Sequence, residues 1–129
     1  MKIALAQINP TVGDFSGNTA LIQKVISDHS DAVDLIVFPE MSLTGYPPQD
    51  LLFEPEFIKK AGESLNVIVG NTNDTGVILG TVREEKNQLF NTAAVIQNSN
   101  IIGFSDKTLL PAYDVFDEMR YFTLANVIN

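Results

Sequence analysis

The opening of the chain constrains its fold more than any other part of the 129 residues, because two apolar segments flank an amphipathic one. Residues Lys2–Ile8 and Asp34–Phe38 are apolar at most positions, and strands of this kind are usually covered on both faces. Between them, apolar residues recur at helical spacing from Leu21 to Ile26, and Asn18 or Thr19 is the expected N-cap. This order predicts a parallel pair of strands joined by a crossover helix.

The rest of the chain adds one helix and three strands. The helix is expected from about Glu54, and its end is open, because Asn66–Gly70 has strand propensity and also fits a continued helix. The further strands are expected at Val77–Val82, Phe90–Gln97 and Ile101–Ser105. The last two are joined across Asn98–Asn100 and predict a hairpin. All five strands are apolar enough to form one sheet with helices on one face.

The composition limits the partners and the chemistry of the chain. Sixteen acidic against eight basic residues give a net charge of −8 without any Lys or Arg run, so neither a nucleic acid nor an anionic membrane surface is expected as a partner. No signal peptide and no apolar stretch near the ~18 residues of a membrane span is visible, which predicts a cytoplasmic protein of one domain. With no cysteine and one histidine, His29, no disulfide, metal site or cysteine nucleophile is expected in this sequence.

Two charged residues follow predicted strands, which is where open α/β sheets bind ligands. Glu40 comes after the segment that ends at Phe38, and it is either a general base or a loop carboxylate that caps a backbone amide. Lys107 follows the strand that ends at Ser105, and it either stabilises an oxyanion or is an ordinary surface lysine. The polar and aromatic segment Tyr113–Tyr121 is either an ion-paired loop or the wall of a polar pocket.

Several segments together resemble the nitrilase superfamily of carbon–nitrogen hydrolases. They are Lys2–Pro10, Phe38-Pro-Glu40, Leu43–Leu52, Lys107–Pro111, Tyr113–Glu118 and Arg120–Phe122. Phe-Pro-Glu is typical of the superfamily, whereas Gly-Tyr-Pro-Pro and the stretch from Lys107 to Phe122 indicate one branch, the glutaminase domains of glutamine-dependent NAD synthetases. The resemblance implies an α/β fold, in which residues 1–129 are the first half of an α-β-β-α sandwich. That half is a mixed sheet with helices on one face, and Asn66–Gly70 belongs to a long helix.

The resemblance also implies roles for four residues. Glu40 matches the general base of the superfamily, and Lys107 matches the lysine that stabilises the tetrahedral intermediate. Glu118 is similar to an additional glutamate near these two, and Tyr113 matches a tyrosine that contacts the glutamine substrate. The third catalytic residue of the superfamily is a cysteine on the next strand, and this sequence has none. We therefore expect the chain to stop just before that strand and to be inactive alone.

The function implied by the resemblance is that of part of a larger enzyme. The glutaminase domain hydrolyses glutamine, and the ammonia serves the ATP-dependent amidation of nicotinic acid adenine dinucleotide in a C-terminal synthetase domain. The implied partners are glutamine and that domain, which would hold ATP and magnesium, while the present chain would hold no cofactor. Because the second half of the sandwich would cover the bare face of the sheet, we also expect this chain to form homo-oligomers.

Two other functions stay open at the level of the sequence. The first is a non-catalytic binding module that kept the fold and lost the nucleophile, which the missing cysteine favours. The second is another amidase of the superfamily, against which the Gly-Tyr-Pro-Pro motif and the stretch from Tyr113 to Phe122 both argue.

Overall fold

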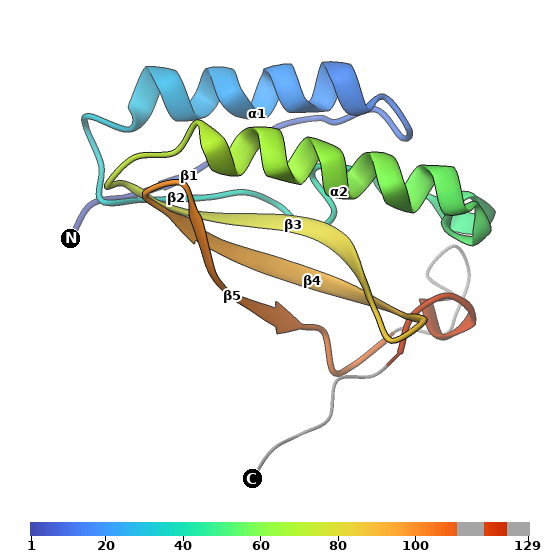
Figure 1. Ribbon diagram of the computed structural model, residues 1–129. Coiled ribbons are helices and arrows are strands. Elements are labelled where there is room, and N and C mark those ends of the chain that lie inside the picture. Colours follow the sequence, from blue (N-terminus) through green and yellow to red (C-terminus); the bar gives the residue numbers. More distant parts are fainter. Residues whose placement is uncertain (111–117, 124–129) are drawn as a thin grey trace, which may run out of the picture.

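One mixed sheet of five strands carries two helices on one face in the computed structural model, which describes residues 1–110 and 118–123 (Figure 1). The strands follow the order of the sequence across the sheet: β1 Ile3–Leu5, β2 Leu35–Val37, β3 Gly76–Glu85, β4 Gln88–Gln97 and β5 Asn100–Asp106. The helices are α1 Phe15–His29 and α2 Pro55–Gly70, with short 3₁₀ turns η1 Gln49–Phe53 and η3 Glu118–Arg120. The predicted mixed sheet with helices on one face is confirmed.

The sheet changes direction at β3. Strands β1, β2 and β3 run parallel, whereas β3, β4 and β5 are antiparallel neighbours. Two-residue turns join the antiparallel strands at Lys86–Asn87 and Asn98–Ser99, and all four residues have positive φ. Turns of this kind match the twist of the flanking strands. The parallel pair at the start of the chain and the hairpin near its end are therefore both confirmed.

The start of α1 differs from the prediction. The helix begins at Phe15, and Asp14 caps it, because its carboxylate accepts a hydrogen bond from the backbone N–H of Gly17 at 2.9 Å. Asn18, one of the two expected caps, lies inside the first turn and is buried. Its amide donates to the carbonyl oxygens of Thr11 and Leu43, so it ties the loop before α1 to the loop after β2. This tertiary role explains why Asn18 does not cap.

The open question at Asn66–Gly70 is settled in favour of a helix. Helix α2 continues to Gly70, and Leu65, Ile68 and Val69 are buried against the sheet at helical spacing. Pro55 occupies the first turn, where its missing N–H costs nothing. Helix packing thus outweighs the strand propensity of the Val-Ile-Val run.

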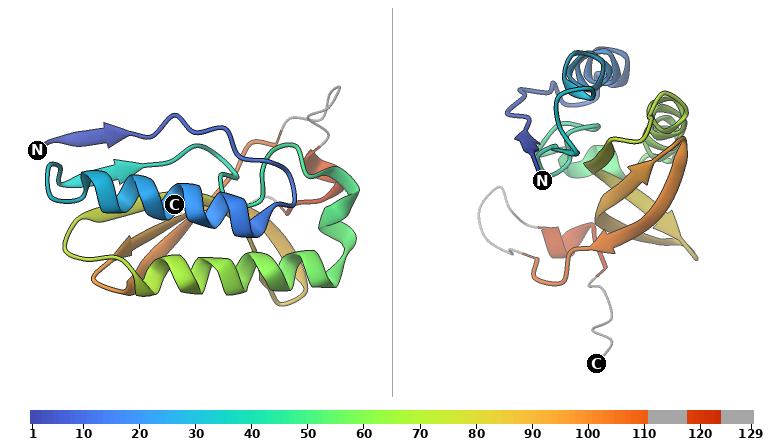
Figure 2. Two further views of the ribbon diagram at one scale, coloured as in Figure 1. Left: turned by 90° about the horizontal axis from the view of Figure 1, so that it is seen from above. Right: turned by 90° about the vertical axis from the view of Figure 1, so that its left-hand side faces the viewer.

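The main core lies between the sheet and the two helices, which cover the same side of the sheet in both views of Figure 2. Its buried members include Ile22, Ile26, Ile36, Leu65, Ile68, Val77, Leu79, Ala94 and Ile96. In the part of the chain that the structure describes, no helix is long and apolar enough to span a bilayer.

The opposite face of the sheet is apolar and largely uncovered. Leu5, Val37, Ile78 and Val95 are register partners across four strands and therefore share this face. Leu5 is 75% exposed and Ile3 is 52% exposed. The expectation that the first strand is covered on both faces is thus wrong for this structure, because both helices pack on the other side.

Candidate active site

Glu40 is placed by the loop that leaves the end of β2. Phe38 still bonds to the sheet, since its N–H donates to the carbonyl oxygen of Ile78 at 2.9 Å, and Pro39 then ends the strand. The loop lies directly on Gly80 of β3, where any side chain would collide with the backbone from Pro39 to Met41. Because Met41 is fully buried, this backbone is anchored on both sides of Glu40.

Lys107 is placed by the end of β5. Its N–H donates to the carbonyl oxygen of Asn91 at 2.8 Å, which continues the pairing with β4 for one residue beyond the strand. Its ammonium lies 2.7 Å from Glu40 Oε1 and 3.1 Å from Glu118 Oε2. Two residues that follow different strands, 67 positions apart in the sequence, therefore meet in one ion pair.

Glu118 completes the cluster from η3. It is only 4% exposed, and it accepts hydrogen bonds from Lys107, from the amide of Asn91 and from the hydroxyl of Tyr46. The sequence left two interpretations of the segment Tyr113–Tyr121, an ion-paired loop and the wall of a polar pocket, and different residues of the segment fit each of them. Glu118 joins the site, whereas Arg120 pairs with Asp50 at the surface.

Tyr113, the residue expected to contact the substrate, lies outside the described residues. Its role in binding glutamine stays a prediction.

Asn91 is a member of the candidate site that was not predicted from the sequence. It lies within β4, and its side-chain amide donates to both Glu40 Oε1 and Glu118 Oε1, while its backbone carbonyl oxygen accepts a hydrogen bond from the backbone N–H of Lys107. One signal was present, because an asparagine in an otherwise apolar strand needs a polar partner when it is buried. Tyr46 was also missed, although it lies in the Gly-Tyr-Pro-Pro motif that supported the resemblance.

The two carboxylates of the cluster differ in how far their side chains are exposed to solvent. The side chain of Glu118 is 5% exposed and that of Glu40 is 46% exposed, so only Glu40 is accessible to a substrate. Burial alone would lower the pKa of Lys107, but the hydrogen bonds that its ammonium donates to Glu40 and Glu118 outweigh burial and raise the pKa above its ordinary value. Lys107 is therefore a charged donor at neutral pH, suited to an oxyanion.

The cluster borders a cavity of about 330 Å³. Its lining residues are Phe38, Glu40, Gly80, Asn91, Thr92, Ala93, Ser105, Asp106 and Lys107. This volume suits a small molecule. Gly80 and Ala93 are register partners on the same face of the sheet as Leu5 and Val95, so the cavity opens on the uncovered face. A larger hollow of about 500 Å³ at the C-terminal ends of α1 and α2 has Asp31 as its one titratable lining residue.

The donors at the site do not suit a metal ion. The position between Glu40 and Glu118 that a cation would take is filled by the ammonium of Lys107. No group of three or more His, Cys, Asp or Glu side chains elsewhere in residues 1–110 and 118–123 is placed to hold a metal.

The ion pair between Lys107 and Glu118 can be tested by titration. Glu118→Gln should lower the pKa of Lys107, because one of the two carboxylates that raise it loses its charge. Since this pKa is raised on folding, the stabilisation is present below the ordinary lysine pKa of about 10.4 and is lost as pH rises through the higher value in the folded chain. The NMR titration of ¹³C-dimethylated lysines measures the pKa. Asp50→Asn is the matched control. An unchanged pKa of Lys107 in Glu118→Gln would contradict the contact between Lys107 and Glu118.

Comparison with known sequences identifies relatives that match nearly the whole of this chain. A glutamine-dependent NAD(+) synthetase of Aquifex aeolicus is 42% identical over 123 residues, and one of Thermotoga maritima is 38% identical over 125 residues. Each match covers 95% of this chain and 22% of the relative. The chain thus spans less than a quarter of the length of these relatives.

Comparison with solved structures supports the fold. A glutamine-dependent NAD+ synthetase from Acinetobacter baumannii superimposes with a TM-score of 0.91 at 34% identity, over 98% of this chain and 24% of that one. An amidase from Nesterenkonia sp. superimposes with a TM-score of 0.81 over 98% of this chain and 49% of that one, but at 21% identity this match shows the fold alone. The sequence model of the carbon-nitrogen hydrolases matches residues 2–124. The chain therefore belongs to the carbon–nitrogen hydrolase family.

Proposed function

We propose that this chain forms part of the glutaminase site of a glutamine-dependent NAD synthetase. The observation that carries the proposal is the cluster of Glu40, Lys107 and Glu118, bridged by Asn91 and bordering a cavity of about 330 Å³. It supplies a reachable carboxylate and a fixed cation, which are two of the three groups that amide hydrolysis by a nucleophile requires.

In this proposal Glu40 transfers protons and Lys107 stabilises negative charge. Glu40 takes the proton of a thiol nucleophile as the sulfur attacks the carboxamide carbon of glutamine, and the ammonium of Lys107 stabilises the resulting oxyanion. Glu40 then returns the proton to the leaving nitrogen, which departs as ammonia and leaves a thioester. Water, deprotonated by Glu40, releases glutamate from the thioester and restores the thiol. Since this sequence contains no cysteine, the thiol has to come from residues outside it.

Further residues and ligands belong to the proposal. Tyr113 contacts the glutamine, and ammonia serves the amidation of nicotinic acid adenine dinucleotide in a C-terminal synthetase domain. The described residues do not fit ATP or magnesium, because Lys107 fills the one cation position at the site and the sequence lacks a phosphate-binding loop. Both ligands are therefore assigned to that other domain. Use of a free thiol fits a reducing compartment such as the cytoplasm.

A non-catalytic module with this fold is the second candidate, favoured by the missing cysteine. A chimera separates the two. Residues 1–124 of this chain replace the matching segment of the Aquifex aeolicus enzyme, and NAD formation is measured with glutamine and with free ammonia. A glutaminase segment should support both reactions. A module without catalytic geometry would support only the reaction with ammonia, and that result would overturn the proposal.

The isolated chain provides the complementary prediction. Incubated with glutamine, it should release no ammonia above a control without protein, because neither Glu40 nor Lys107 forms the thioester. The assay is an enzyme-coupled measurement of ammonia. Turnover by this chain would contradict the need for an external thiol.

A further inference from the structure

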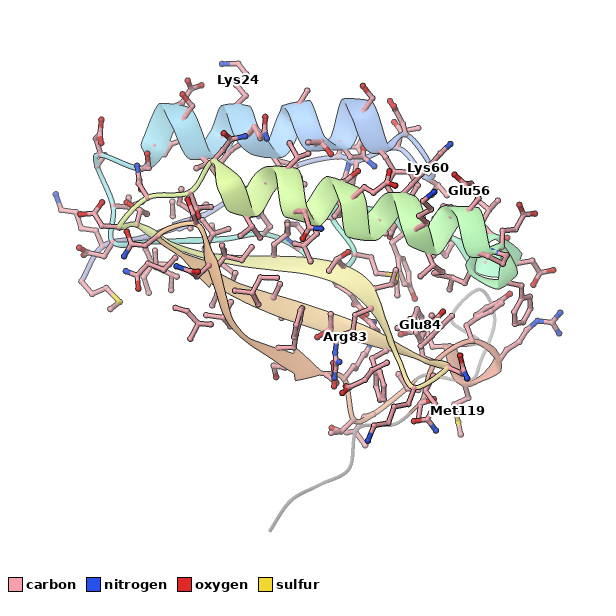
Figure 3. All side chains as sticks on the ribbon, in the orientation of Figure 1. Lys24, Glu56, Lys60, Arg83, Glu84 and Met119 are labelled. Carbon is pink, nitrogen blue, oxygen red and sulfur yellow. The ribbon has the colours of Figure 1, made fainter. Side chains whose placement is uncertain are left out.

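Arg83 forms a second ion-paired cluster beside the site. The side chain of Arg83 is labelled in Figure 3. Its guanidinium donates from Nε to Asp106 Oδ1 at 2.9 Å and from Nη2 to Asp106 Oδ2 at 2.5 Å, so the pair is bidentate. The guanidinium also lies over two aromatic rings, 4.9 Å from the centroid of Phe90 and 5.0 Å from that of Phe104. The Arg83 guanidinium holds the pKa of Asp106 below its usual value. Planar stacking and a bidentate carboxylate together fix an arginine in one geometry.

This cluster of Arg83, Asp106, Phe90 and Phe104, the Arg83 clamp, holds the residue that directly precedes Lys107. Asp106 is the last residue of β5 and pairs with Thr92, while the N–H of Lys107 bonds to Asn91. Successive residues of a strand point to opposite faces. Asp106 therefore points to the face of Arg83, and Lys107 points to the face of Glu40. Asp106 and Lys107, two consecutive residues at the end of β5, therefore lie on opposite faces of the sheet.

This strand end has few other supports in the described part of the chain. β5 lies at the edge of the sheet, so β4 is its one strand neighbour. Beyond Lys107 the ladder stops, and Leu109 is 83% exposed. The backbone next to the ammonium is held by the hydrogen bond from the Lys107 N–H to Asn91, by a hydrogen bond of 3.2 Å from the Thr92 hydroxyl to the carbonyl oxygen of Ser105, and by the side chain of Asp106.

We propose that Arg83 is a positioning residue for Lys107, acting through Asp106 to fix the strand end that brings the ammonium to Glu40 and Glu118. The catalytic consequence rests on the proposed function, whereas the structural claim concerns this chain alone. The two are therefore tested with separate readouts.

The structural test uses the isolated chain with three variants. Arg83→Met keeps an apolar stem between the rings and removes the guanidinium, and Arg83→Lys keeps the charge without the bidentate fork. Glu85→Gln is the matched control, because it removes only the charge of Glu85, the second carboxylate paired with Arg83, and the side chain of Glu85 is 55% exposed. The readouts are hydrogen exchange of the Lys107 N–H and the NMR titration of Lys107.

In Arg83→Met, exchange of the Lys107 N–H should accelerate relative to core amides of β4, on the order of tenfold to a hundredfold. The pKa of Lys107 should also move down toward its ordinary value. Arg83→Lys should show both effects more weakly, and Glu85→Gln should show neither. If Arg83→Met does not fold, Asp106→Asn weakens the same pair and is measured in the same way. A loss of global stability with both Lys107 readouts unchanged would overturn the proposal.

The catalytic test uses the chimera. Arg83→Met should reduce NAD formation from glutamine and leave formation from ammonia unchanged. If the unmodified chimera already fails with glutamine while the Lys107 readouts respond in the chain, the proposed function is wrong and the positioning role stands. If the chimera is active and the variant loses no glutamine-dependent activity, the catalytic consequence of the clamp is refuted.

Discussion

Glu40→Gln in the chimera should abolish NAD formation from glutamine while formation from ammonia continues. The substitution keeps the shape of the side chain and its contacts as a hydrogen-bond acceptor, but it removes the group that takes the proton of the thiol. A general base contributes about 10²–10⁴-fold, and its loss costs more where the catalytic groups act as one unit. The measurement is the rate of NAD formation with each nitrogen source in the same preparation.

The control for this substitution is Glu84→Gln. Glu84 is an exposed glutamate near the end of β3 and lies outside the cluster. Its substitution changes the net charge by the same amount as Glu40→Gln. It should affect neither nitrogen source. An equal loss of both reactions in Glu40→Gln would instead show that Glu40 has a structural role in the loop on Gly80.

The sequence predicted the two parts of the site that follow strand ends. Glu40 and Lys107 were singled out because each follows a strand and open α/β sheets bind ligands beyond the carboxyl ends of strands, and in the structure Lys107 Nζ lies 2.7 Å from Glu40 Oε1. The role of Glu118 came from the resemblance rather than from its position. Its burial depends on η3 folding back against β4, which no local pattern predicts.

Asn91 and Arg83 were missed for a different reason. Both lie inside strands, where the period of apolar residues identifies the element but does not reveal which polar side chains are paired. Their roles depend on the register between β3, β4 and β5, and register is set by two-residue turns. Asn18 illustrates the same limit, because its hydrogen bonds to the loop before α1 and to the loop after β2 outweigh its local preference for the N-cap.

The uncovered face of the sheet leads to the second prediction of large effect, which is self-association of this chain. Leu5, Val37, Ile78 and Val95 form a continuous apolar row across four strands, and Leu5 is 75% exposed. Monomers rarely expose apolar patches larger than a few hundred Å², and burial contributes about 25 cal/mol per Å². Two copies packed face to face would bury both rows in the manner of a sandwich of aligned sheets.

Leu5→Lys should therefore shift the chain toward the monomer, because a charged ammonium in the middle of such an interface would lose its hydration without a partner. Val67→Lys is the matched control, since Val67 is 53% exposed on α2 and lies on the helical side of the molecule. Light scattering and sedimentation at micromolar concentration measure the mass of each variant. The unmodified chain and Val67→Lys should have the mass of a dimer or a larger oligomer, and Leu5→Lys should have a lower mass than both. A monomeric unmodified chain that melts cooperatively and binds no hydrophobic dye would show that this face is stable in water, and the predicted association would then be wrong.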